Sequence, residues 1–118
     1  MISKIMDLTA DLAVGNKVVI DISGWESLTV QAIGGGGTMS LSATNNGGDV
    51  TGSLDGSPGN AANFTAIQAV NLTDGTTATT VTGNNLFRIT PISFKYLQIG
   101  DGATATATKL LVFVTKPY

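Results

Sequence analysis

Four aspartates in glycine-rich turns are the residues of this sequence with the clearest capacity for chemistry: Asp49, Asp55, Asp74 and Asp101. Two carboxylates at a suitable separation can hydrolyse a glycosidic bond, and loop carboxylates with carbonyl oxygens can bind calcium. Each of the four precedes or neighbours glycine or another turn residue, where an aspartate commonly accepts hydrogen bonds from its own turn. No segment has the D-x-[DN]-x-[DN]-G spacing of a calcium loop. We therefore expect turn residues here, with no catalytic site, no metal site and no cofactor.

Residues for nucleophilic catalysis and for phosphate binding are also missing. The sequence contains no histidine and no cysteine, and the Ser3–Lys4 pair lies in no catalytic motif. The run Gly34–Gly37 is followed by a strand pattern and by no G-K-[ST] segment, unlike a phosphate-binding loop. We therefore expect a protein that is not an enzyme.

The composition favours a protein covered by neighbouring subunits. Of the 118 residues, 42% are hydrophobic and only 12% are charged, against roughly 25% charged in an average soluble domain. The net charge of −2 and the pI near 4.6 argue against nucleic acid as a partner, since that role needs clustered basic residues. The six basic residues are instead scattered singly: Lys4, Lys17, Arg88, Lys95, Lys109 and Lys116.

Targeting signals and covalent crosslinks are not expected. No apolar run is long enough to span a bilayer, and the N-terminal segment MISKIMDLTADL has no signal-peptide core or cleavage site. These features predict synthesis in the cytoplasm and no membrane partner. Without cysteine, neither disulfides nor thiolate metal sites can stabilise the fold.

Several short segments alternate apolar and polar residues or are rich in β-branched residues, which is typical of strands. They lie at residues 17–23, 27–33, 38–44, 64–72, 76–82 and 103–115. The glycine run Gly34–Gly37 predicts a hairpin between the second and third of them. The last strand is expected to end buried on both sides. Residues 49–63 hold turn formers and few core candidates, and predict a long exposed loop.

The stretch Leu86–Ile99 is expected to organise the core. Its two apolar runs, Leu86–Thr90 and Phe94–Ile99, predict adjoining strand segments separated at Pro91, because proline cannot donate to a sheet ladder. Three of its aromatic residues are large enough to seed the core: Phe87, Phe94 and Tyr96.

Seven to nine short strands with no convincing long helix predict an all-β fold, a single antiparallel β-sandwich of jelly-roll type. The N-terminal segment has loose helical spacing but suits an extended arm equally well, and we favour the arm. The predicted organisation is an N-terminal arm at residues 1–16 and a β-sandwich domain at residues 17–118. The apolar residues of the arm are candidates for contact with another subunit: Ile2, Ile5, Met6 and Leu8.

Four segments carry a resemblance to a known family. They are WESLTVQA from Trp25, GGTMSLSATNNGG from Gly36, NFTAIQAVNLTDGTTATTVTGNNLFRI from Asn63 and KYLQIGDGATATATKLLVFV from Lys95. Together they resemble a β-sandwich domain that recurs in the virion proteins of tailed bacteriophages, over roughly residues 17 to 115. The chain departs from that family at Phe64, where tryptophan is usual, and at residues 49–63, which look like an insertion.

The resemblance implies a virion structural protein. A freestanding copy without a fibre shaft is similar to capsid decoration, or cement, proteins, which bind the outer head surface and are often trimers. It implies the major capsid protein and further copies of the chain as partners, on the outer capsid surface of the virion. Apolar edges and the N-terminal arm would bury surface against neighbours and hold capsomers together.

A second reading is a carbohydrate-binding or receptor-binding tip of a phage tail fibre. There, Trp25 and the 49–63 loop would contact glycans. Burial of Trp25 in a core or interface is the commoner arrangement for tryptophan. Tyr118 is either an interface anchor or an inert tail, and Arg88, the single arginine, is either an intersubunit ion-pair partner or an ordinary surface charge.

Overall fold

The computed structural model describes residues 1–45, 64–100, 102 and 107–117, which form one short helix and eleven strands. The elements are β1 Ile2–Asp7, α1 Thr9–Gly15, β2 Lys17–Asp21, β3 Ser27–Ile33, β4 Thr38–Thr44, β5 Thr65–Ala66, β6 Ala69–Asn71, β7 Thr77–Ala78, β8 Thr80–Thr82, β9 Asn85–Ile89, β10 Tyr96–Gly100 and β11 Lys109–Lys116. The predicted loop at 49–63 lies outside the described residues, as do Asp49, Asp55, Asp101 and Tyr118.

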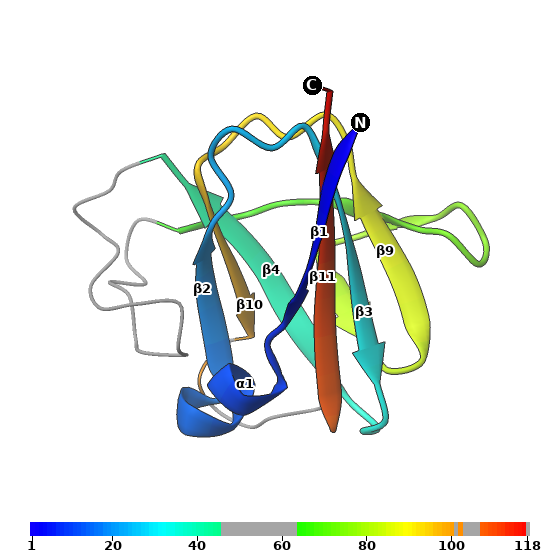
Figure 1. The fold of residues 1–118 in the computed structure, drawn as a ribbon. Coiled ribbons are helices and arrows are strands. Elements are labelled where there is room, and N and C mark those ends of the chain that lie inside the picture. Colours follow the sequence, from blue (N-terminus) through cyan, green and yellow to red (C-terminus); the bar gives the residue numbers. More distant parts are fainter. Residues whose placement is uncertain (46–63, 101, 103–106, 118) are drawn as a thin grey trace.

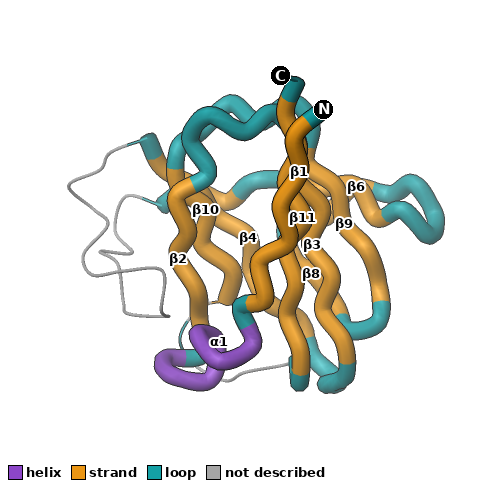
Figure 2. Tube along the Cα trace, in the orientation of Figure 1, coloured by secondary structure: helices purple, strands orange, loops and turns teal. Residues whose placement is uncertain are grey.

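Two antiparallel sheets pack face to face, which confirms the predicted all-β sandwich (Figure 1). One sheet has the strand order β1-β11-β3-β9-β6-β7, and the other has the order β2-β10-β4-β5, with β8 also paired to β4. The helix α1 joins the two sheets at one end of the sandwich (Figure 2). Among the described residues, no helix has the length and hydropathy needed to cross a membrane.

Apolar side chains from alternate strand positions fill the space between the sheets, because successive side chains of a strand point to opposite faces. Each sheet contributes one face of its central strands, including Leu28 and Val30 from β3 and Leu97 and Ile99 from β10. Phe87 is the largest fully buried side chain, and most of the other core residues are aliphatic. Phe94 packs against this core partly buried, as expected.

The expectation for Tyr96 was wrong. It is only partly buried, while its neighbour Leu97 is fully buried in the core. The alternation along β10 therefore turns the Tyr96 side chain to the opposite face of the sheet. The core accordingly condenses on Phe87 and aliphatic residues, with two of the three predicted aromatic residues contributing.

The predicted hairpin across Gly34–Gly37 was also wrong. β3 pairs with β11 and β9, whereas β4 pairs with β10, β5 and β8, so the glycine run crosses from one sheet to the other. Gly34 and Gly35 adopt positive φ angles of 73° and 77°, and the Gly34 N–H donates to Asn84 Oδ1 at 3.2 Å. This crossing lets the apolar faces of β3 and β4 meet across the core. Burial of these faces favours the arrangement over a hairpin in which the two strands pair edge to edge.

Other predicted strands are divided in the same way. The segment 64–72 forms β5 in one sheet and β6 in the other, and β9 and β10, on either side of Pro91, also lie in different sheets. The last strand begins at Lys109; of the residues expected before it, 107 and 108 are not in a strand, and 103–106 lie outside the described residues. Its end is buried on one face only: Val112 and Val114 are fully buried, whereas Phe113 is 40% exposed.

The N-terminal segment combines both local structures that its sequence allows. Residues 2–7 are extended as β1 and pair with β11 of the same chain, with Ile2 opposite Lys116 and Asp7 opposite Leu111. Helix α1 follows, buries Leu12, and ends at Asn16, whose left-handed backbone (φ 58°) lets its N–H donate to Leu12 O at 2.9 Å. The segment expected as an arm therefore contributes the edge strand of the six-stranded sheet.

Three described aspartates act as turn residues, and each accepts hydrogen bonds from the residue two places later: Asp7, Asp21 and Asp74. Asp74 Oδ1 accepts hydrogen bonds from the Thr76 hydroxyl at 2.7 Å and the Thr76 N–H at 3.0 Å. Both bonds favour the ionised carboxylate and lower the pKa of Asp74 from its usual value, and the bond from the hydroxyl has the larger effect. The pKa of Asp7 is lowered in the same way by Thr9, whose hydroxyl has the larger effect and whose backbone N–H has the smaller one.

We predict that acid weakens the fold partly through Asp74. Because its folded-state pKa lies below the unfolded value of 3.8, the stabilisation is present above that value and is lost as pH falls through the folded pKa. Urea unfolding at pH 7 and pH 3 should therefore show a larger loss for the wild type than for Asp74→Asn, whose amide does not titrate. Equal losses in the two proteins would show that Asp74 carries no acid-sensitive stabilisation.

Candidate functional site at the Trp25 end

One end of the sandwich gathers segments that are far apart in the sequence. The loop between β2 and β3, the loop between β9 and β10, the start of β1 and the end of β11 meet there, and both chain termini lie at this end (Figure 1). We call this surface the Trp25 end and define it by the residues that line its two adjoining hollows: Met1, Ile2, Gly24, Trp25, Glu26, Ser27, Ile92, Thr115, Lys116 and Pro117.

Backbone hydrogen bonds fix the position of the Trp25 loop. The Glu26 N–H donates to Thr115 O at 3.0 Å, and Glu26 O accepts from the Ile92 N–H at 2.7 Å. The Trp25 N–H closes a tight turn onto Ile22 O at 3.2 Å, and the turn requires the positive φ of 86° at Gly24. The loop that carries Trp25 is therefore tied to both neighbouring segments.

The indole of Trp25 is held between the core and a cation. The side chain is partly buried and packs against the core, and Lys116 Nζ lies over the ring, 4.7 Å from its centroid. A lysine in this position is attracted by the negative face of the ring. A glycan platform needs an open aromatic face, and here Lys116 covers one face. The arrangement suits an anchor within a protein contact better than a sugar-stacking surface.

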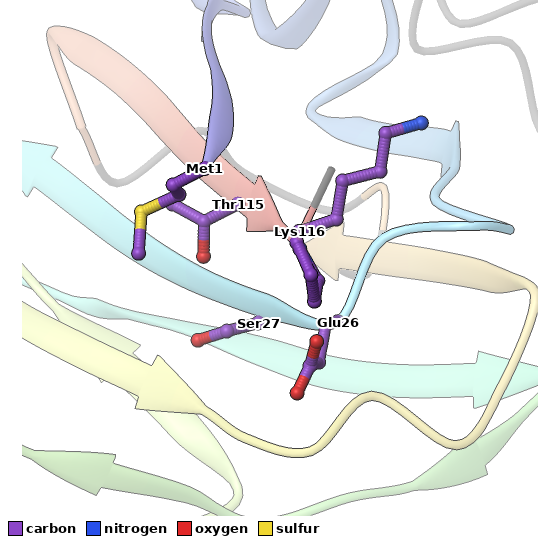
Figure 3. A pocket seen from close by; sticks show the side chains of 6 residues that line it. Met1, Glu26, Ser27, Thr115 and Lys116 are labelled. Atoms are coloured by element: carbon purple, nitrogen blue, oxygen red, sulfur yellow. The ribbon is translucent and has the colours of Figure 1, made fainter.

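Two shallow hollows flank this ring. The first, of about 410 Å³, lies beside the ends of β1 and β11 and contains Met1, Ser27 and Thr115 in its wall (Figure 3). The second, of about 540 Å³, is lined by Ile2, Trp25 and other residues of this end. In Figure 3 the Lys116 side chain extends away from the Glu26 carboxylate, so the two charges stand apart. Apolar walls with separated charges at the rim are typical of protein contact surfaces.

The described residues do not assemble a group suited to metal binding. No set of three or more His, Cys, Asp or Glu side chains comes together within the described part of the chain. At the Trp25 end the carboxylate comes from Glu26, which lines a hollow together with Ser27 and Lys116. The surface can bury apolar groups and accept or donate a few hydrogen bonds, which is the chemistry of recognition.

The structure brings together only some of the residues singled out in the sequence. Ile2 and Trp25 line the same hollow. Ile5 lies farther along β1 and is 67% exposed, opposite Phe113 of β11. Met6 packs partly buried against the core, and Leu8 is buried in it. Arg88 is exposed on β9, opposite Thr29 of β3, and lines neither of the two hollows.

Sequence reasoning missed two features of the surface. Lys116 belongs to the Trp25 end only because the ladder between β11 and β3 brings the chain end beside Trp25. Phe113 was expected to be buried, but it is exposed between buried Val112 and Val114; because residues 110–114 are all apolar, the sequence pattern does not mark this exposure. With Ile5 it forms an exposed apolar pair on the outer face of the six-stranded sheet.

A comparison with solved structures finds a protein that shares the fold of this chain. No family model matches the chain, and no curated protein matches it by sequence. Its fold is that of a prophage-derived protein. The crystal structure of the SPBc2 prophage-derived protein YomS superimposes with a TM-score of 0.65 and 11% sequence identity, over 96% of this chain and 92% of that one. At this identity the likeness establishes a shared fold.

Proposed function

We propose that this chain is a structural protein of a tailed bacteriophage, a capsid decoration protein that binds the outer head surface and stabilises contacts between capsomers. The observation that carries the proposal is the match of nearly the whole chain to a prophage-derived protein of the same fold. The resemblance of the strand and turn segments to virion proteins of tailed bacteriophages also supports the proposal. The proposed partners are the major capsid protein and further copies of the chain, arranged as a trimer on the head.

The proposed role is mechanical and needs no catalysis. Protein contacts of this kind generally bury on the order of 1,000 Å² or more, and many weak contacts on one particle add through avidity. The low content of charged residues, 12%, reduces the desolvation that such a contact would require. Exposed apolar side chains at Met1, Ile2 and Ile5 are available for the same burial.

The Trp25 end is the proposed capsid contact. Its indole is already held in place by the core and by Lys116, so little side-chain entropy is lost when a partner covers it. Tryptophan is also among the residues enriched at the energetic centres of interfaces. The tail-fibre reading is less favoured because Lys116 covers a ring face that a glycan would need.

We predict that Trp25→Ala weakens binding to heads by at least about 30-fold, the equivalent of a central interface residue contributing about 2 kcal/mol. Binding is measured by co-sedimentation of the purified protein with heads that lack it. Leu72→Ala serves as the matched control, because Leu72 is 44% exposed and does not belong to the Trp25 end. Circular dichroism establishes that both variants are folded. If both variants bind as well as the wild type, the capsid contact lies elsewhere on the molecule.

A further inference from the structure

The N-terminal strand β1 contributes little to the core of its own chain. Five of its six residues are exposed and only Met6 is partly buried. The strand lies at the end of the chain and at the edge of its sheet, and it is held by its antiparallel ladder to β11. Separation of β1 from β11 would therefore break ladder hydrogen bonds but uncover little apolar surface.

The connection between β1 and the rest of the chain is a single residue, Leu8, which leads directly into α1. Leu8 itself belongs to the fixed body: its side chain is buried, its N–H donates to Leu110 O at 2.8 Å, and the neighbouring Thr9 Oγ1 accepts from the Leu110 N–H at 3.1 Å. The hinge therefore lies at the junction of Asp7 and Leu8. Across the hinge, the Thr9 N–H donates to Asp7 Oδ1 at 3.1 Å, in an exposed turn. Short hinges of this kind favour exchange of the terminal element between copies.

We propose that β1 is an exchangeable arm, which in the assembled protein pairs with β11 of a neighbouring copy in the register that it has within one chain. The ladder from Ile2 opposite Lys116 to Asp7 opposite Leu111 is the same in both arrangements, so exchange conserves these hydrogen bonds. Each copy both gives and receives a strand. Such exchange closes a ring of any small number of subunits, the proposed trimer included.

Exposed apolar side chains give the exchanged form an advantage. Met1, Ile2 and Ile5 are 73%, 42% and 67% exposed, and Phe113 beside Ile5 is 40% exposed. When copies meet along this edge, part of this surface leaves water, which favours association. Mass action adds to the effect as the protein concentration rises on the particle.

The length of the arm limits which copy can receive it. Six extended residues span roughly 20 Å. In the conserved register Asp7 lies opposite Leu111, so the receiving β11 must begin beside the donor's hinge, in a copy that is in direct contact. The inference rests on the self-association contained in the proposed function, but it does not depend on binding to heads and is tested on the purified protein alone.

The test uses a cysteine pair in a chain that has no cysteine of its own. In Ile5→Cys/Phe113→Cys the two thiols lie opposite each other on the outer face of the sheet, within reach of a disulfide. After oxidation of the refolded protein, we expect covalent multimers on a non-reducing gel, which a reductant returns to monomers. The largest closed product also reports the number of subunits. Oxidised protein that migrates only as an internally bonded monomer would overturn strand exchange.

Two controls separate exchange from chance collision. The single variants Ile5→Cys and Phe113→Cys should crosslink poorly when each is alone, but should crosslink to one another when they are refolded as a mixture. Insertion of Gly-Ser-Gly between Asp7 and Leu8 in the double variant lengthens the hinge and should shift the product toward the internally bonded monomer. Equal crosslinking of the single variants alone and of their mixture would contradict the proposed register. Loss of head binding with crosslinking intact would count against the capsid role and leave exchange standing.

Discussion

Phe87→Ala is expected to lower the free energy of unfolding by about 3–5 kcal/mol, the largest effect of any substitution considered for this chain. Phe87 is 2% exposed and is the largest fully buried side chain, with the other core residues mostly aliphatic. Its removal deletes apolar burial and leaves a cavity between two sheets whose backbones are fixed by their ladders. A loss of this size is a large fraction of the total free energy of unfolding of a small domain.

Urea unfolding followed by circular dichroism measures the effect. The matched control is Leu86→Ala, one residue earlier on the same strand β9, where the side chain is 39% exposed on the opposite face. We expect this control to lose less than about 1 kcal/mol. A similar loss for the two variants would mean that Phe87 does not hold the position in the core that the structure gives it.

Gly100→Ala is expected to destabilise the fold by about 2–5 kcal/mol, through backbone strain and crowding together. Gly100 ends β10 opposite Lys17 of β2, with a φ of 94° that side chains rarely adopt. A Cβ atom there would lie 2.6 Å from Asn16 O and 3.1 Å from the Cα of Lys17. Both neighbours are backbone atoms, so neither can move aside without disturbing the β2–β10 pair.

The control for this substitution is Gly36→Ala in the crossing between β3 and β4. A Cβ atom at Gly36 would meet nothing within 4 Å, and its φ is outside the left-handed region. We expect a change within about 0.5 kcal/mol, or slight stabilisation from a less flexible unfolded chain. Thermal and urea midpoints of the two variants make the comparison. Equal stability of Gly100→Ala and wild type would contradict the close approach of β10 to the end of α1.

The sequence predicted which residues face the core better than which strands pair. Alternation at Leu28 and Val30, and at Met39 and Leu41, identified buried faces correctly, because that pattern is local to each strand. Pairing depends on where the chain crosses between sheets, and Gly34–Gly37 carries no residue preference that separates a hairpin from a crossing. The strands at 17–23, 27–33 and 38–44 were therefore expected in nearly the right places, but the one predicted pairing, between 27–33 and 38–44, was wrong.

The candidate site was harder to predict for the same reason. Trp25 and Ile2 stood out as large apolar residues, but nothing local links either of them to Ile92 or Pro117. Their meeting follows from the order β1-β11-β3, which places the two chain ends beside the Trp25 loop. Lys116 over the indole ring is a product of this order too. Long-range pairing therefore assembles the site, and local pattern identifies only some of its members.

We propose that the protein binds the phage head, and the most direct test is its binding to separated virion parts. Purified protein is sedimented with heads that lack it and, in parallel, with isolated tails. We expect saturable binding to heads, no binding to tails, and heads that withstand a higher temperature once covered. Binding to tails alone, or retention by host-surface glycans with no affinity for heads, would contradict the decoration role and favour a tail-fibre tip.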